Sequence, residues 1–221
     1  MDVPERAAGL RAHALETAVC ERCGLAESRA RVVYGQGAVD AELMLVGEAP
    51  GFLEEQQGVP FAGQAAELLE RLLASIGLTR DHVYLANVLN CRPPQNRDPR
   101  EEEIAACEPL LFRQISLVRP RVVATLGNVA TKLLSARPHG ITRVHGQEHN
   151  VVVGGHACLL FPLYHPAAAL YTPSMLRVLE HDVARLGELL GRRLALPAPE
   201  APPAVPEPST ASRASVQLGL F

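Results

Sequence analysis

The sequence predicts an α/β fold in which a parallel sheet is covered by helices on both faces. Short apolar runs of strand length alternate with longer segments whose apolar residues recur at helical spacing. Strands that alternate with helices in this way form parallel sheets with helices on either side. Polar residues, namely Glu48, Asn87 and His165, stand at the ends of three of these runs. Because ligands bind beyond the carboxyl ends of parallel strands, we expect these side chains to converge on one site.

In chain order, the predicted elements begin with an Ala- and Leu-rich helix over 5–18 and a buried strand over 42–47. The spacing of apolar residues predicts a helix over 65–76, and a second apolar run predicts a strand over 83–88. Asp98, followed by Pro99, is expected to cap the next helix.

The second half of the chain continues the alternation. The remaining predicted elements are the body of that helix to about 117, a strand over 121–126, a helix over 127–134, a hairpin formed by 151–153 and 158–161, and a helix over 175–190.

Composition sets limits on the class of protein. The chain has 221 residues, of which 48% are hydrophobic, so we expect one domain over residues 1–194 with a full core. The net charge of −3 gives no overall sign of nucleic-acid binding. Neither a secretory signal nor an apolar run long enough for a membrane span is visible, so we expect a cytoplasmic protein and, by default, a monomer.

Four of the five cysteines have the spacing of a metal site. Cys20 and Cys23 form a C-x2-C pair, and Cys91 and Cys107 follow after a long interval. Four thiolates suit either tetrahedral zinc or a 4Fe-4S cluster, and spacing alone does not choose between the two. Cys158 lies in an apolar strand and is expected to be a buried side chain.

Several motifs together carry a family resemblance. They are CERC at 20–23, GEAPG at 47–51, GVPFAG at 58–63, NVLNCRPPQNR at 87–97, Cys107, and YHPAA at 164–168. In this order they resemble the family 4 uracil-DNA glycosylases, the iron–sulfur class of the uracil-DNA glycosylase superfamily. The resemblance implies an α/β/α sandwich with a four-stranded parallel sheet. It also implies a structural 4Fe-4S cluster on Cys20, Cys23, Cys91 and Cys107, and excision of uracil from DNA as the first step of base-excision repair.

The resemblance also assigns roles in binding the base. Phe61 matches the aromatic platform for a flipped uracil, and Asn87 matches the amide that reads its edge, because an amide offers both a donor and an acceptor. His165 is expected to donate to uracil O2 as the bond breaks. The first motif would contact the base through its backbone, and its residues are Gly47, Glu48, Ala49, Pro50 and Gly51.

Activation of water is the role with several candidates. Ala49 stands where other uracil glycosylases carry an Asp, so no carboxylate acts from that position. Glu48 is the first candidate for its place in the motif, followed by Glu54 and Asn96. Leu170, just past the His-Pro motif, is expected to fill the gap left in the DNA stack.

The last part of the sequence changes in composition. Residues 195–215 are rich in Pro and Ala and are expected to be a disordered linker. Residues 216–221 contain a match to the peptide that binds bacterial sliding clamps, carried by Gln217, Leu218, Leu220 and Phe221. Apolar anchors of this kind suit a groove on a partner.

An alternative function remains open at this point. A zinc-stabilised module that binds nucleic acid or nucleotides without catalysis would share the four cysteines and the α/β fold. The nature of the metal and the release of free uracil separate the two interpretations.

Overall fold

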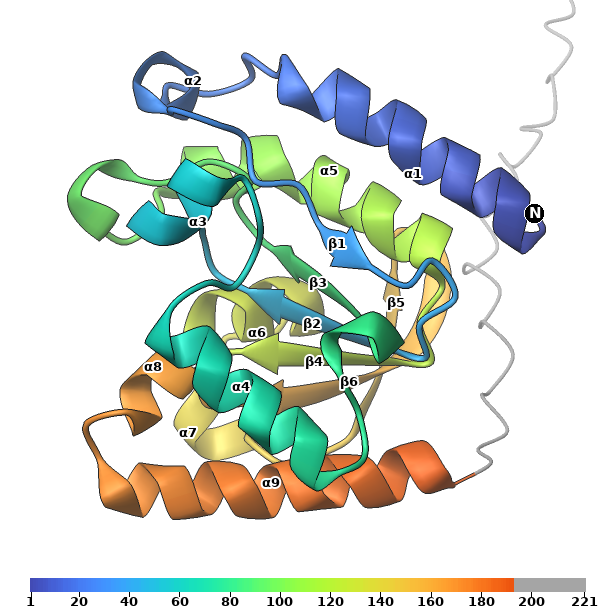
Figure 1. The fold of residues 1–221 in the computed structure, drawn as a ribbon, viewed down its shortest axis with the longest axis vertical. Coiled ribbons are helices and arrows are strands. Elements are labelled where there is room, and N and C mark those ends of the chain that lie inside the picture. Colours follow the sequence, from blue (N-terminus) through green and yellow to red (C-terminus); the bar gives the residue numbers. More distant parts are fainter. Residues whose placement is uncertain (193–221) are drawn as a thin grey trace, which may run out of the picture.

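The computed structural model describes residues 1–192 and places a mixed six-stranded sheet at the centre of the domain (Figure 1). The strand order is β1-β3-β2-β4-β6-β5. The strand bounds are β1 Gln36–Gly37, β2 Leu43–Gly47, β3 Val83–Asn87, β4 Val122–Leu126, β5 His149–Val153 and β6 His156–Leu163. The four central strands are mutually parallel, which confirms the predicted parallel sheet. Two antiparallel edge strands, β1 and β5, extend it.

Both faces of the central strands are buried, and side chains alternate between them. In β2, Met44 and Val46 join the core on one face, whereas Leu43 and Leu45 join the core on the other. This alternation follows from the two-residue period of a strand. A strand buried on both faces reads as an uninterrupted apolar run, which is why the LMLVG segment shows no polar alternation.

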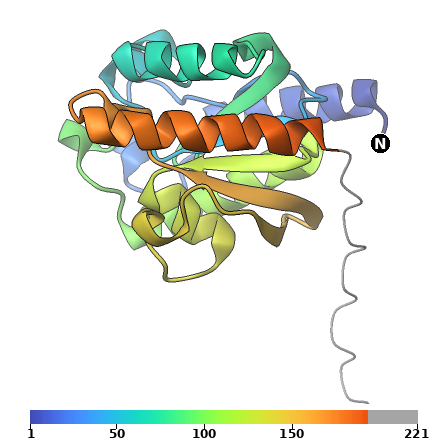
Figure 2. The ribbon, with the colours of Figure 1, turned by 90° about the horizontal axis from the view of Figure 1, so that it is seen from below.

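Helices cover each face of the sheet (Figures 1 and 2). One face packs against α1 (Val3–Ala18), α5 (Glu101–Val118) and α6 (Asn128–Ser135). The opposite face packs against α4 (Gln64–Ser75), α8 (Pro166–Ala169) and α9 (Pro173–Gly191). The chain is therefore a three-layer α/β/α sandwich, as predicted.

Shorter elements connect these layers. The short helices are α2 Leu25–Ser28, α3 Phe52–Gln57 and α7 Ile141–Val144, and single 3-10 turns span Arg80–His82 and Pro94–Asn96. Two of them, α3 and the Pro94–Asn96 turn, follow the carboxyl ends of β2 and β3 and carry residues of the site described below.

The start of α5 differs from the prediction. Asp98 does not cap this helix, because the N-cap is Arg100, two residues later. The Glu103 carboxylate reaches back to accept the Arg100 backbone N–H at 2.9 Å and forms an ion pair with Arg97. The helix begins where this carboxylate can accept the backbone N–H of the N-cap residue. The two-residue strand β1 was also not predicted, since it has no apolar run.

Some predictions fall outside the described residues. The linker over 195–215 and the peptide Gln217–Phe221 both lie beyond residue 192. Within residues 1–192, no helix combines the length and the apolar character that crossing a bilayer requires.

Candidate active site

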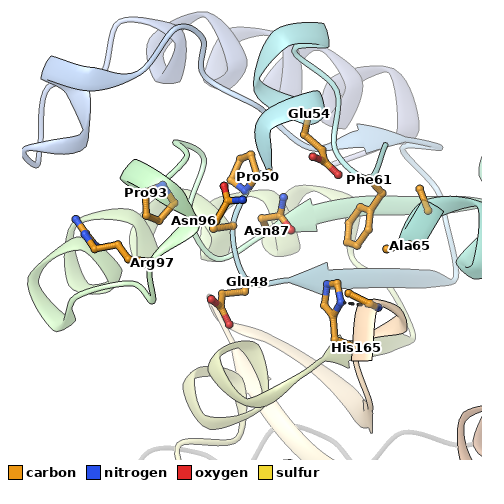
Figure 3. A pocket seen from close by; sticks show the side chains of 14 residues that line it. Glu48, Pro50, Glu54, Phe61, Ala65, Asn87, Pro93, Asn96, Arg97 and His165 are labelled. Carbon is orange, nitrogen blue, oxygen red and sulfur yellow. Dashed lines mark hydrogen bonds between the residues drawn. The ribbon is translucent and has the colours of Figure 1, made fainter. Parts of the chain in front are cut away.

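A cavity of about 410 Å³ opens at the carboxyl ends of β2, β3 and β6 (Figure 3). Its lining combines the first motif with residues from the loops after β3 and β6. The lining residues are Glu48, Ala49, Pro50, Gly51, Glu54, Phe61, Ala65, Ala66, Asn87, Pro93, Asn96, Arg97, His165 and Ala167. All four residues named as catalytic candidates from the sequence therefore lie around one cavity.

Gly47, Asn87 and Phe61 form one tightly packed wall of the site. A Cβ atom added at Gly47 would lie 2.4 Å from Asn87 Oδ1 and 2.9 Å from Phe61 Cζ. A larger residue at position 47 would thus clash with Asn87 and Phe61, and Gly47 contributes to the site by leaving room for both side chains. Asn87 is only 5% exposed, at the end of β3, with its amide directed toward the cavity (Figure 3).

Phe61 adopts a left-handed backbone conformation, with φ of 57°. This conformation is unfavourable for a bulky residue, and it persists only where the surroundings hold it. Arg80 supplies that restraint, because its guanidinium donates to the carbonyl oxygens of Pro60 and Phe61, both at 2.8 Å. Arg80 was not predicted as a site residue, and no motif in the sequence marks it.

A backbone hydrogen bond occupies one ring nitrogen of His165 and leaves the other, Nε2, available to a ligand. Its Nδ1 accepts a hydrogen bond from the Ala167 backbone N–H at 3.1 Å. Nδ1 therefore carries no proton, and in the neutral ring Nε2 is the donor. Burial lowers the pKa of His165, against a smaller opposing effect of the Glu54 carboxylate. The ring is consequently a neutral hydrogen-bond donor near neutral pH.

Two carboxylates face the cavity in different environments (Figure 3). Burial raises the pKa of Glu48, and the nearby Asp98 carboxylate raises it further. Glu54, on α3, accepts the Ala62 backbone N–H through Oε1 at 2.9 Å. The pKa of Glu48 is thus shifted in the direction expected of a general base, whereas Glu54 is partly engaged in holding the Phe61 loop.

Asn96 presents a defined end of its amide to the site. Arg92 Nε donates to Asn96 Oδ1 at 2.6 Å. Because a guanidinium has only donors, the atom facing Arg92 must be the amide oxygen. The Nδ2 group is then the part of Asn96 that remains available as a donor.

Leu170 and Tyr171 follow α8 and differ in exposure. Leu170 is partly buried against the core beneath α4 and α9. Tyr171, the next residue, is 83% exposed. Neither residue lines the cavity, so the predicted wedge residue lies beyond its wall.

The four predicted metal ligands meet in a second, smaller cavity. It is lined by Cys20, Cys23, Cys91 and Cys107 together, as the spacing predicted. Burial raises the pKa of the Cys91 thiol and raises that of Cys107 to about 11. Cys158 lies apart in β6, is 2% exposed, and is a core side chain as predicted.

The same cavity fits a cluster better than a single metal ion. Among residues 1–192, no group of three or more His, Cys, Asp and Glu side chains could hold a metal ion. An iron–sulfur cluster is bulkier than one ion, so its four thiolates stand around a wider space. Four cysteines around a shared cavity fit such a cluster. Arg29 adds a cation there, donating to the Cys20 carbonyl oxygen at 2.5 Å with Nη1 3.9 Å from Cys91 Sγ.

Comparison with known proteins places this site in a family. The model of the uracil DNA glycosylase superfamily matches residues 34–187, and the chain belongs to that superfamily. Its relatives include the type-4 uracil-DNA glycosylases of Sulfurisphaera tokodaii and Thermotoga maritima. The first is 43% identical over 79% of this chain and 81% of the relative, and the second is 37% identical over 75% and 86%. A type-5 enzyme of Pyrobaculum aerophilum is 31% identical over 62% of this chain and 66% of the relative. Within the superfamily, the chain thus stands with the type-4 enzymes.

The raised pKa of Glu48 predicts that this carboxylate lowers stability at neutral pH. A carboxyl whose pKa is raised on folding favours the folded state below its unfolded pKa, and this contribution is lost as pH rises through the folded pKa. We therefore expect Glu48→Gln to raise the melting temperature near neutral pH, with the gain disappearing in acid. Thermal unfolding across a pH series measures this.

Glu180, exposed in the interior of α9, offers a control, since Glu180→Gln should change the melting temperature far less than Glu48→Gln. A Glu48→Gln variant that is less stable than the parent protein at neutral pH would contradict the prediction.

Proposed function

We propose that this protein excises uracil from DNA by hydrolysing the N-glycosidic bond of a flipped deoxyuridine, using the residues of the 410 Å³ cavity. The observation that carries the proposal is the convergence of Asn87, Phe61, His165 and Glu48 on that one cavity. The base has to leave the duplex stack, because its glycosidic bond cannot be reached inside the helix. This reaction is the first step of base-excision repair.

Recognition of uracil rests on Asn87 and Phe61. The Asn87 amide donates to uracil O4 and accepts from N3–H, and Phe61 stacks beneath the ring. Cytosine presents the inverse pattern and would leave buried polar groups unpaired, at a cost of roughly 1–3 kcal/mol each. The backbone of residues 47–51 forms the remaining edge of the base site, with thymine excluded by its methyl group near Glu48.

Departure of the base depends on His165. As the glycosidic bond breaks, negative charge develops on the uracil and the sugar becomes oxocarbenium-like. Nε2–H of the neutral His165 donates to O2 and stabilises the departing uracil anion. Since the Ala167 N–H already fixes the tautomer, the donor is preorganised and needs no rearrangement during the reaction.

Attack by water is assigned to Glu48 with Asn96. A carboxylate has to accept the proton of the water, and Glu48 has the raised pKa suited to that role. Asn96 offers Nδ2–H, which donates to the water oxygen and orients it without removing a proton. Glu54 stands as the second carboxylate at the same cavity, with one oxygen held by Ala62.

The deciding experiment is the release of free uracil from a uracil-containing oligonucleotide. We expect release by the parent protein, and a fall of about 10²- to 10³-fold for His165→Ala, because a preorganised donor to the leaving group is lost. DNA binding should persist in this variant.

His181→Ala is the matched control, since His181 is an exposed histidine on α9. Absence of uracil release by the parent protein would overturn the proposed function. Full turnover by His165→Ala would overturn the role of His165 alone.

We also propose that the cysteine cavity holds a structural 4Fe-4S cluster. When bound, the cluster would cross-link the segment that follows α1, the loop after β3 and α5, and no step of the reaction passes through it. The convergence of the four cysteines on one cavity supports this role, because four cysteine thiolates are the usual ligands of such a cluster.

Cys107→Ser should remove iron and the visible absorbance of the cluster and lower the melting temperature. Cys158→Ser is the control, because Cys158 is equally buried but distant from the ligand set. Iron and sulfide analysis measures the difference. Stoichiometric zinc in the parent protein, without iron or visible absorbance, would contradict the proposal.

Leu170 is proposed as the side chain that fills the gap left by the flipped nucleotide. Its position just past α8 supports this, although Tyr171 beside it is far more exposed. Leu170→Ala should weaken binding to duplex DNA carrying an abasic analogue by about tenfold, the cost of one well-packed apolar contact. If Tyr171→Ala weakens binding instead and Leu170→Ala does not, the wedge is Tyr171.

The segment Gln217–Phe221 is proposed to bind a bacterial sliding clamp, with Leu218, Leu220 and Phe221 as apolar anchors. Such a contact raises the local concentration of the enzyme on newly replicated DNA. Deletion of residues 217–221 should abolish binding to purified clamp and leave uracil release from free oligonucleotides unchanged. Clamp binding that survives the deletion would refute this role.

A further inference from the structure

Glu55 is a buried carboxylate that faces away from the cavity. It follows Glu54 on α3, is 6% exposed, and is absent from the cavity lining. A buried carboxylate is costly unless its oxygens are hydrogen-bonded or paired with a cation. Both oxygens of Glu55 have such partners, and the two partners belong to different functional regions.

The first oxygen of Glu55 is bonded to the segment that touches the cysteine cavity. Oε1 accepts the Ala30 backbone N–H at 3.0 Å. The preceding residue, Arg29, contacts the Cys20 carbonyl oxygen and Cys91 Sγ. Glu55 is therefore linked to the cysteine cavity through two adjacent residues, since it binds Ala30 and the neighbouring Arg29 contacts Cys20 and Cys91.

The second oxygen leads to the active-site loop. Oε2 lies 3.4 Å from Arg92 Nη1, and the exposed fractions of these side chains are 7% for Glu55 and 21% for Arg92. The same guanidinium donates through Nε to Asn96 Oδ1 at 2.6 Å and lies over the Phe52 ring, 5.3 Å from its centroid. Arg92 is thus held on three sides while it orients Asn96.

The loop that Arg92 contacts has an unfavourable backbone conformation. Gln95 and Asn96 have φ values of 57° and 54°, so two consecutive non-glycine residues adopt the left-handed conformation. Such residues persist where the surrounding structure over-determines them. In this loop, the Arg92 hydrogen bond restrains the Asn96 side chain directly.

We propose that Glu55 is a positioning residue for uracil excision, which holds Arg92 so that Asn96 directs Nδ2–H at the attacking water. Through its bond to Ala30, the same carboxylate also connects the loop that carries Asn96 to the Arg29–Ala30 segment beside the cysteine cavity. The inference rests on the proposed function and adds to it a residue that touches neither the base nor the water.

The test is Glu55→Gln in the full-length, cluster-loaded protein. Glutamine keeps an oxygen for the Ala30 N–H, but the NH2 group that it turns toward Arg92 cannot accept from that guanidinium. We expect the single-turnover rate to fall about tenfold with KM little changed, since a misplaced group slows the reaction more than it weakens binding. The visible absorbance and the iron content should stay at the level of the parent protein.

A double-mutant cycle with Asn96→Ala identifies the route of the effect. If Glu55 acts through Asn96, Glu55→Gln has no further effect on the rate in the Asn96→Ala background. A merely structural role would reduce the rate by the same factor in both backgrounds, and that outcome would overturn the inference.

Two further variants complete the test. Glu42→Gln is the control for the loss of an arginine–carboxylate ion pair away from the cavity. Glu42 pairs with Arg121 at 3.2 Å, next to the amino ends of β2 and β4, and the rate of this variant should equal that of the parent protein. Arg92→Lys keeps a cation for Glu55 but lacks the Nε–H donor, so it should reproduce the loss even if Glu55→Gln fails to fold.

The possible failures are distinguishable. Absence of uracil release by the parent protein refutes the proposed function. Release by the parent protein together with unchanged rates in Glu55→Gln and Arg92→Lys refutes only the positioning role of Glu55.

Discussion

The parallel pairing of β2 with β3 is the constraint on which the site depends. Its register sets Gly47 directly opposite Asn87 at the carboxyl ends of the two strands. The missing side chain of Gly47 leaves the space that Asn87 Oδ1 and the Phe61 ring occupy. A shift of one residue would turn every side chain of the strand to the other face and separate this group, so the packing of both sheet faces also protects the site.

The site combines groups with opposite electrostatic requirements. His165 has a lowered pKa and remains a neutral donor, whereas Glu48 has a raised pKa and is the better proton acceptor for it. Burial causes both shifts, because it disfavours the charged form of either group. The same desolvation therefore favours the neutral form of His165, the proposed leaving-group donor, and raises the basicity of Glu48, the proposed water-activating carboxylate.

The residues that hold the site are mostly cations donating to oxygen atoms. Arg80 restrains the Phe61 loop through two carbonyl oxygens, and Arg92 restrains the Asn96 loop through an amide oxygen. Both loops contain left-handed non-glycine residues. Arginine suits this work because its planar fork donates several hydrogen bonds in fixed directions. Strained loop conformations at the active site are thus held by side chains from outside it.

The sequence by itself determined the layer architecture, the parallel direction of the central strands and most of the residues that line the cavity. Apolar periodicity marks strands and helices locally, and motifs such as GEAPG and YHPAA lie directly after strands, where parallel topology brings them together. The spacing of four cysteines likewise predicted their common cavity.

Only the tertiary structure decided which partner each polar group finds. Nothing local to Arg80 or Glu55 distinguishes either from the other charged residues of the chain, because the loop segments that they contact lie between 19 and 37 residues away. The short strand β1 was missed for the same reason, since it forms only by pairing with β3. Hydrogen bonds and ion pairs between distant segments depend on where folding places both partners, and no periodicity in the sequence records that placement.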